Sequence, residues 1–386
     1  MAEPSSAAQE AKPLAKFSEN LAVLERVDLQ SEAVDRDKIF PIMSISKSFF
    51  GAVCALMAVD GEFGNKGVDT TLDEVLQGAE RKYPSRAKEI VEYRELLRSK
   101  DFADVTVAEM LSHRSGFHDV YEEKDGVKAG AYEGRRLEFF QEQMSRREFQ
   151  RGEYHYSNEG ITLMEEILNL ACENGYEAEL QKRICGPLKL AHTGSLYRSS
   201  EALERVGEAV YLAGSTHPIR QEKLEETERF PGEKCSSFGD SPLSEGGLCS
   251  TVNDLEKYSE ELVKMALGQP NSLTEKRDEM SKIYHRHELL TEGQEGYVCG
   301  LRFAKGKSGE LIVYHDGGYP ANNSSMRVEM DCQFDDFKDG DKQKLANAQI
   351  KQGEVSLQKS DAVADRLVGL GNDSARNFLR NYFNSK

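Results

Sequence analysis

In the stretch FPIMSISKSFFGAVCALMAVDGEF, from Phe40 to Phe63, a serine and a lysine precede the longest apolar run of the chain, near Phe49 to Val59. The residues from Ser44 to about Val59 have a helical pattern, and the glycines of the following DGEFG suit a helix end. Ser44 and Lys47 are three residues apart and would share one helix face. The unpaired N–H groups at a helix start would stabilise negative charge on the serine. The stretch is either an ordinary helix start with a solvated lysine or a nucleophile with its activating cation.

The same Ser-x-x-Lys spacing occurs twice more, and the surroundings separate the three copies. Ser85 with Lys88 lies in YPSRAKEI, and Ser356 with Lys359 lies in EVSLQKSD. In both charged stretches the lysine is expected to be simply solvated. Only Ser44 precedes an apolar helix, where a lysine held against apolar neighbours loses its proton more easily. The motif alone is equally compatible with a lysine whose charged end extends to solvent.

A second candidate element is Tyr156-Ser157-Asn158, in the sequence GEYHYSNEG. A tyrosine normally ionises at about pH 10, so it becomes a useful base only beside cations. The Asn158 amide can donate one hydrogen bond to a substrate and accept another from a lysine. The structural alternative is that Ser157 or Asn158 caps the next helix while the tyrosines pack. A second Tyr-x-Asn, at residues 382–384, lies in the C-terminal tail and is given no weight.

A third candidate element, His315-Asp316-Gly317-Gly318, ends the predicted strand ELIVY. Glycine on a strand lets a ligand approach the backbone closely, and such an edge can supply an N–H group to an oxyanion. The alternative is a histidine that merely ends a strand. Similar triplets at 192–194 and 307–309 compete, but the second lies in a predicted hairpin turn.

Together and in this order, the three elements resemble the serine β-lactamase and penicillin-binding-protein-like hydrolases. The Tyr-x-Asn and His-x-Gly forms are similar to the branch that contains class C β-lactamases, D-alanyl-D-alanine carboxypeptidases and related esterases. Three further segments resemble stretches of that family: AEMLSHRSGF (Ala108–Phe117), ICGPLKLAHTGS (Ile184–Ser195) and GGLCSTVNDLEKY (Gly246–Tyr258). The matches span Ser44 to Gly318, about two-thirds of the chain.

The resemblance implies a role for each motif residue and requires no metal or other cofactor. It implies that Ser44 is the acylated nucleophile and that Lys47 and Tyr156 transfer protons. Asn158 would position the substrate and the lysine, and His315 would lie beside Tyr156. The Ser44 and Gly318 N–H groups would form the oxyanion hole, and Asp316 and Gly317 would contact the substrate. His113 and His118 are five residues apart and could suggest a metal site. The family loop and the lack of a third ligand nearby argue against it.

The expected fold class is α/β (α+β): a β-lactamase/transpeptidase-like antiparallel sheet flanked by terminal helices, with an inserted helical subdomain. Residues 1–20 are predicted to be a flexible arm and 21–386 a single catalytic domain. Within it, 21–64 and 290–386 would form the sheet subdomain and 65–289 the helical one.

The finer pattern predicts several elements and one irregularity. A helix is predicted at Asn158–Tyr176, a hairpin around KGKSG within Gly296–Pro320, a third strand at Ser324–Met330 and a last helix from Asp365 to Phe383. Only about forty residues precede Ser44, where Leu21–Leu29 is a strand or a short helix, and the polar stretch after Met330 has no strong strand. The sheet is therefore expected to be reduced or irregular.

Composition limits the partners and the compartment. The formal net charge of −17 argues against nucleic acid and anionic membranes. Seven cysteines are scattered singly, which suits a reducing compartment. No signal-peptide pattern or membrane-spanning run is recognised, so the protein is expected to be cytoplasmic or exported without a Sec signal.

The expected activity is that of an esterase-like serine hydrolase acting on a small ester, amide or peptide. Asp316 stands where carboxylate-binding members of the family carry Thr or Ser, so a neutral or cationic substrate is favoured. A peptidase, D-amino-acid amidase or carboxypeptidase is the next alternative. The alternative from another class of function is a catalytically silent family member with a binding or assembly role. The charged segment Ser215–Lys234 is either a lid near the site or a solvated excursion.

Overall fold

The computed structural model describes residue 36 and residues 40–117, 136–145, 150–195, 228–230, 233–234, 243–286, 295–319 and 322–359. Its helices are η2 (Met43–Ile45), α1 (Ser46–Val59), η3 (Gly67–Asp69), α2 (Leu72–Lys82), η4 (Pro84–Arg86), α3 (Ala87–Ser99), α4 (Val107–Leu111), α5 (Arg136–Met144), α6 (Asn158–Ala171), α7 (Gly175–Leu180), η7 (Gln181–Cys185), α8 (Gly186–Leu188), η11 (Leu243–Gly247), α10 (Val252–Ala266), α11 (Arg277–Tyr284), α12 (Phe334–Lys338) and α13 (Lys342–Asn347). Its strands are β1 (Phe40–Pro41), β2 (Gly194–Ser195), β3 (Glu228–Phe230), β4 (Glu233–Lys234), β5 (Leu248–Ser250), β6 (Glu295–Val298), β7 (Leu301–Lys305), β8 (Glu310–Tyr319), β9 (Asn322–Gln333) and β10 (Ile350–Lys359).

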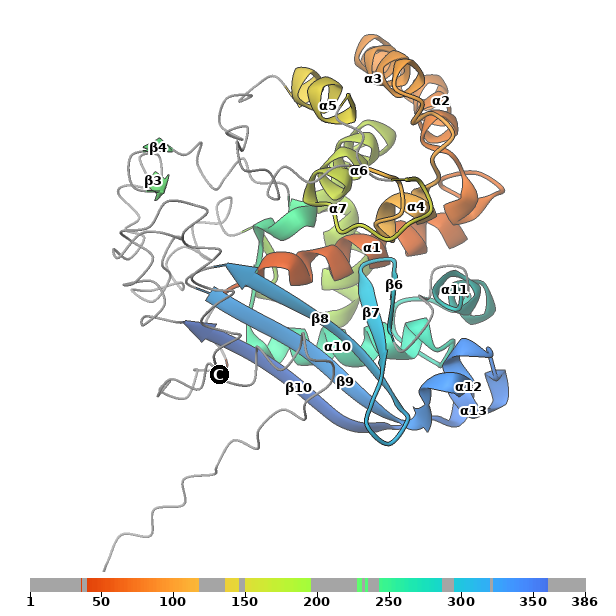
Figure 1. Cartoon of the computed structure of the whole chain (residues 1–386), viewed down its shortest axis with the longest axis vertical. Helices are drawn as coiled ribbons and strands as arrows, with labels where there is room; N and C mark the ends of the chain where they lie inside the picture. Colours follow the sequence, from red (N-terminus) through yellow and green to blue (C-terminus); the bar gives the residue numbers. More distant parts are fainter. Residues whose placement is uncertain are drawn as a thin grey trace, which may run out of the picture.

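The main sheet has five antiparallel strands in the order β10-β9-β8-β7-β6. Helix α1 runs between this sheet and helices α6 and α7, and α10 lies along β9 and β10 (Figure 1). A second sheet of short strands, in the order β1-β5-β2, joins the chain just before α1 to the chain just before α10. Helices therefore cover the face of the main sheet on which α1 lies.

The predicted hairpin and third strand of the main sheet are confirmed, and its edge strand β10 was not foreseen. The hairpin around KGKSG is β7 and β8, and the turn is closed by the Gly309 N–H, which donates to Gly306 O at 3.0 Å. The third predicted strand is part of β9. The expectation of no strand in the polar stretch after Met330 is wrong, because β10 pairs with β9 along nearly its whole length. Because β10 is an edge strand, its backbone pairs with a neighbour on one side only, and its sequence does not need a long apolar run.

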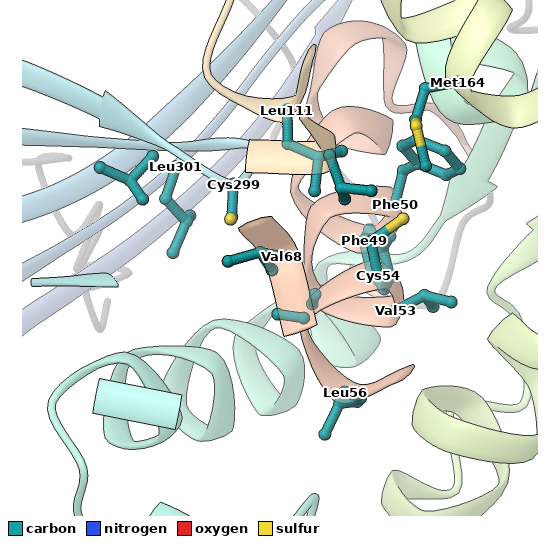
Figure 2. Packing of buried hydrophobic residues seen from close by; sticks show 14 of the residues in the cluster. Phe49, Phe50, Val53, Cys54, Leu56, Val68, Leu111, Met164, Cys299 and Leu301 are labelled. Atoms are coloured by element: carbon teal, nitrogen blue, oxygen red, sulfur yellow. The ribbon is translucent and has the colours of Figure 1, made fainter. Parts of the chain in front are cut away.

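Helix α1 is the centre of the packing. All of its residues from Ser46 to Ala58 are buried, as expected for a helix that is apolar on all sides. In Figure 2, side chains of α1 pack together with Leu111, Met164 and the Cys299–Leu301 region of the sheet. The helix touches the β6–β7 turn so closely that a Cβ atom built on Gly51 would lie 1.9 Å from Cys299 O.

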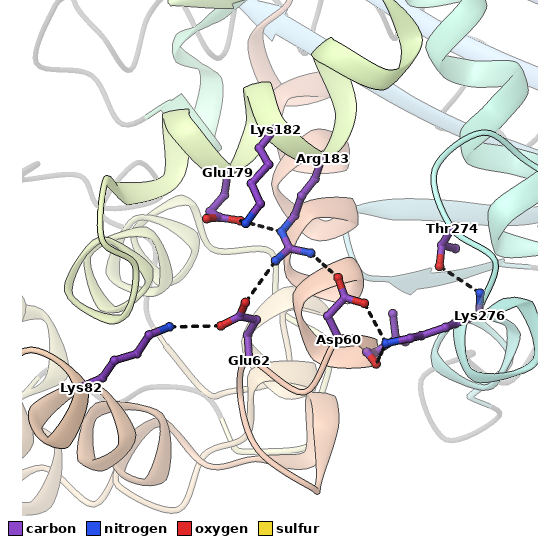
Figure 3. Close-up of polar contacts among 9 residues, drawn as sticks. Asp60, Glu62, Lys82, Glu179, Lys182, Arg183, Thr274 and Lys276 are labelled. Carbon is purple, nitrogen blue, oxygen red and sulfur yellow. Dashed lines mark hydrogen bonds and ion pairs between the residues drawn. The ribbon is translucent and has the colours of Figure 1, made fainter.

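The C-terminal end of α1 is held by ion pairs (Figure 3). Asp60, which follows the helix, binds Arg183 at 2.6 Å and Lys276 at 2.8 Å. Arg183 also binds Glu179 at 2.6 Å. These contacts lower the pKa of Asp60, although its partial burial acts in the opposite direction. The C-terminal end of α1 is thereby fixed relative to the rest of the helical layer.

Several expectations fall on residues outside the described part of the chain. These are the arm at 1–20, the segment 21–29, His118, residues 215–227 of the charged segment, and the helix at 365–383. The two-subdomain division stays a prediction. In the described residues, no helix is both long and apolar enough to cross a membrane. The six described cysteines are free thiols, all buried.

Candidate active site

Ser44 and Lys47 are in contact at the start of α1. Ser44 lies in the 3₁₀ turn η2, two residues before the α-helix begins at Ser46. The Lys47 Nζ donates a hydrogen bond to Ser44 Oγ at 3.1 Å. Ser44 is partly exposed, whereas Lys47 is only 1% exposed, so its ammonium does not extend to solvent.

The other two Ser-x-x-Lys copies have no such arrangement. The Lys88 side chain, on α3, is 94% exposed. Ser356 and Lys359 lie on strand β10, not at the start of a helix. Both copies are accounted for by ordinary surface or strand positions.

The partners of Lys47 are neutral. Its Nζ donates to the backbone oxygen of Glu245 at 2.6 Å and lies 5.1 Å from the centroid of the Tyr156 ring. No described carboxylate forms an ion pair with it. Glu245 belongs to the π-helical turn η11, which packs between α1 and α6, and its carboxylate accepts a hydrogen bond from Thr162 at 3.1 Å. A buried cation without a counter-ion is costly for a fold, which makes this lysine a candidate functional group.

Tyr156 and Asn158 flank the residue that starts α6. Ser157 is the N-cap, and its Oγ accepts the Gly160 N–H at 3.0 Å, so the predicted cap is confirmed. Tyr156 precedes the cap and is partly exposed, and Asn158 is the first residue of the helix. The Arg302 guanidinium lies 6.0 Å from the Tyr156 ring centroid, so two cations face this tyrosine.

The end of strand β8 contacts the turn that carries Ser44. A Cβ atom built on Gly317 would lie 2.4 Å from Ile42 O and 2.9 Å from Met43 Cβ, so only glycine fits here. Ser324, which pairs with Gly317 from β9, donates to Ile42 O at 2.8 Å. The predicted Gly-containing strand end is therefore brought next to Ser44.

Strand β8 also has an unpaired edge at this point. It pairs with β9 as far as Tyr319 but with β7 only from Leu311 to Tyr314. Across the described residues, no strand pairs with positions 316–319 on the β7 side. Gly318 lies on this stretch, where a backbone N–H or C=O group can bind an extended ligand.

His315 is buried and neutral. Its Nδ1 lies 2.7 Å from Asp316 O and, since a carbonyl oxygen only accepts, Nδ1 carries the proton. Its Nε2 then accepts from the Tyr297 hydroxyl at 2.9 Å. Burial, Arg302 and Lys47 hold the pKa of His315 well below its usual value. Proton exchange near neutral pH is thus left to other groups of the site.

Asp316 is bound within the sheet. Burial raises its pKa, while the Ser325 hydroxyl, which donates to Oδ1 at 2.8 Å, and the charges of Arg302 and Arg327 act in the opposite direction. The carboxylate predicted to repel an anionic substrate therefore has a partner on β9.

Three residues near the site lie outside the motifs and were missed in the sequence as functional candidates: Glu245, Tyr297 and Arg302. Tyr297 and Arg302 reach it because β6 pairs with β7 in a register that places them opposite each other. Only correct strand pairing would have identified them. His113 was considered only as a metal ligand, and in the described residues no group of three potential ligands was found.

Comparison with known proteins gives a consistent family and fold. Residues 22–327 match the family model described as Beta-lactamase. A solved octameric penicillin-binding protein homologue from Pyrococcus abyssi is 18% identical, with a TM-score of 0.55 over 91% of this chain and 67% of that chain. A D-stereospecific amidohydrolase from Streptomyces sp. is 18% identical, with a TM-score of 0.53 over 80% and 82% of the two chains. A class C beta lactamase from Rhodobacter sphaeroides is 14% identical, with a TM-score of 0.51 over 91% and 86%. No curated protein matches the sequence.

Proposed function

The chain belongs to the Beta-lactamase family, and we propose that it is a serine hydrolase acting through an acyl-enzyme on Ser44. Its antiparallel sheet and helices form the β-lactamase/transpeptidase-like fold that was expected. Members of this family are mostly serine hydrolases, which supports the general class of activity.

The observation that carries the proposal is the contact of the buried Lys47 Nζ with Ser44 Oγ at 3.1 Å. With one proton removed from the Lys47–Tyr156 pair, as the lysine amine or the tyrosine phenolate, this pair takes the proton of Ser44 as the serine oxygen attacks the substrate carbonyl carbon. The Ser44 and Gly318 N–H groups bind the resulting oxyanion. When the bond to the leaving group breaks, that proton passes to the leaving group, and a water molecule later releases the acid from Ser44.

For the substrate, we favour a neutral or cationic ester or amide with esterase-like turnover. Asp316 at the end of β8 and the net charge of −17 support this preference. The unpaired edge at 316–319 equally suits an extended amide, so a peptidase or D-amino-acid amidase is the second candidate.

The test is treatment of the purified protein with a fluorophosphonate probe, read by intact mass. We expect one adduct on the wild type, none on Ser44→Ala, and one on the matched control Ser85→Ala. A folded wild type that takes no adduct would reject the hydrolase and favour the silent binding member.

The substrate preference has a separate test. Short-chain esters, dipeptide amides and nitrocefin are compared with the same preparation. Faster turnover of neutral esters than of dipeptide amides is expected. Nitrocefin hydrolysis at an ordinary enzymatic rate would show the preference to be wrong.

A further inference from the structure

His113 lies between the segment that carries Tyr156 and the sheet. It follows α4 and is 2% exposed. Its ring centroid is 4.3 Å from that of Tyr156 and 4.6 Å from that of Tyr297. Tyr297 is the residue that binds His315. The imidazole thus contacts the ring above Lys47 on one side and the partner of His315 on the other.

The same side chain binds the backbone next to Tyr156. The Ser157 N–H donates to His113 Nδ1 at 3.1 Å, and the His155 N–H donates to His113 O at 2.8 Å. Tyr156 is therefore bracketed by two hydrogen bonds to one residue. Because Nδ1 accepts, the proton of the neutral ring is on Nε2, which has no hydrogen-bond partner among the described residues.

That arrangement costs stability in two ways. A buried N–H without a partner is unfavourable, and His113 has a φ of +56°, in the left-handed region that most residues avoid. A phenylalanine would fill the same space without a buried N–H group that lacks a hydrogen-bond partner. What phenylalanine lacks is the acceptor at the Nδ1 position, so the acceptor is the property that the site uses.

We propose that His113 is a positioning residue, whose neutral imidazole holds the Tyr156 phenol over Lys47 by accepting the Ser157 N–H and packing against the phenol ring. This inference rests on the proposed function, because Tyr156 is assigned there to proton transfer. His113 touches neither Ser44 nor a substrate and acts only through Tyr156.

Protonation of His113 would undo this positioning. A proton on Nδ1 removes the acceptor and places a cation in a site that is already positive. The groups facing the ring are Lys47 of α1, Arg302 of β7, His315 of β8, Tyr297 of β6, and Tyr154, His155 and Tyr156 of its own partner segment. Burial first, and then the charges of Lys47 and Arg302, hold the pKa of His113 well below its usual value, which favours the neutral form.

The test compares two amide side chains in the full-length protein. In His113→Asn the amide oxygen can stand where Nδ1 stands, and asparagine tolerates a positive φ. In His113→Gln the amide lies one carbon further out, at the Nε2 position. Ser115→Ala is the control from the same loop, since its hydroxyl accepts only the Phe117 N–H, at 3.3 Å, within the described residues. His113→Gly, which has no left-handed strain, replaces the glutamine variant if that variant does not fold.

Two readouts are taken on folded protein: the rate of fluorophosphonate labelling of Ser44, and the ¹³C resonance of the Tyr156 phenol, assigned with Tyr156→Phe. We expect labelling of His113→Asn and Ser115→Ala within about threefold of wild type, and of His113→Gln slower by roughly tenfold or more. The Tyr156 resonance should shift only in His113→Gln or His113→Gly.

Equal labelling rates in wild type and His113→Gln, or an unmoved Tyr156 resonance, would overturn the inference. A wild type that takes no label, with a Tyr156 resonance that still moves in His113→Gln alone, would reject the proposed function and retain the positioning role. The two failures are therefore distinguishable.

Discussion

Lys47 differs from an ordinary lysine at a helix start in its burial and in its partners. It is 1% exposed, it contacts Ser44 Oγ, and none of the described carboxylates forms an ion pair with it. A surface lysine at a helix start would have none of these properties, as Lys88 shows with 94% exposure. The difference between two copies of one short motif is thus a difference in burial.

Replacing Lys47 by methionine should abolish activation of Ser44 while preserving most of the packing. Fluorophosphonate labelling is expected to fall by roughly 10²–10⁴-fold, the usual contribution of a positioned acid–base group. Lys88→Met is the matched control and should label at the wild-type rate. Unchanged labelling of a folded Lys47→Met protein would remove Lys47 from the mechanism.

The Tyr297 hydroxyl should contribute to stability through His315. In Tyr297→Phe the His315 Nε2 loses its donor at 2.9 Å, which should cost about 1–3 kcal/mol in the free energy of unfolding, measured in urea. Tyr284→Phe is the control, because the buried Tyr284 hydroxyl has no hydrogen-bond partner in the described part of the chain, and its removal should be neutral or stabilising. Equal losses in both variants would contradict the assigned hydrogen bond.

At the scale of elements, helix α1 is positioned by backbone contacts that only glycines allow. Gly51 faces Cys299 O, and a Cβ atom on Gly300 would lie 2.1 Å from Lys47 O. Gly300 also has a φ of +78°. The helix that carries Lys47 therefore packs directly against the turn between β6 and β7, the two strands that supply Tyr297 and Arg302.

Gly51→Ala should weaken the contact between α1 and the turn that joins β6 to β7. The new methyl group would meet a backbone carbonyl, and overpacking of this kind costs about 1–3 kcal/mol or more. Gly78→Ala on α2 is the matched control: a Cβ atom placed there would have no atom of the described residues within 4 Å, so the substitution should stabilise the helix by roughly 0.5–1 kcal/mol. Urea unfolding of the two variants checks the opposite signs, and equal signs would contradict the close approach.

The elements show which parts of the structure a sequence can reveal. The KGKSG turn and the Ser157 cap were predictable because their local chemistry requires a hairpin and a helix start. Strand β10 was not, because an edge strand such as IKQGEVSLQK is stabilised by backbone pairing and has no apolar run. Ser44 also lies in a 3₁₀ turn and not in the α-helix that its spacing suggested.

Across the whole molecule, the site collects residues that are far apart in the sequence and strained in their backbone. Met43, His113 and Cys299 all have positive φ values, at 47°, 56° and 47°. Met43 precedes Ser44, His113 binds the segment that carries Tyr156, and Cys299 contacts helix α1. Such conformations cost about 1–3 kcal/mol each and are typical of functional sites. No sequence pattern predicted them, because each is imposed by the elements packed around it.

The two buried histidines predict how stability varies with pH. The native pKa values of His113 and His315 are both well below the usual value, so on acidification the unfolded chain takes up protons first. The free energy of unfolding should therefore fall as pH falls below about 6.5, by up to about 1.4 kcal/mol per pH unit for each histidine. Urea unfolding at several pH values should give a shallower slope for His113→Asn than for wild type. Identical slopes would show that the pKa of His113 is the same in the native and unfolded states.

Activation of Ser44 is tested by the mass of the protein after brief fluorophosphonate treatment, with the adduct mapped to its peptide. We expect a single adduct, on the peptide that contains Ser44. An unmodified, folded protein, or an adduct on a different serine such as Ser85, would contradict this activation.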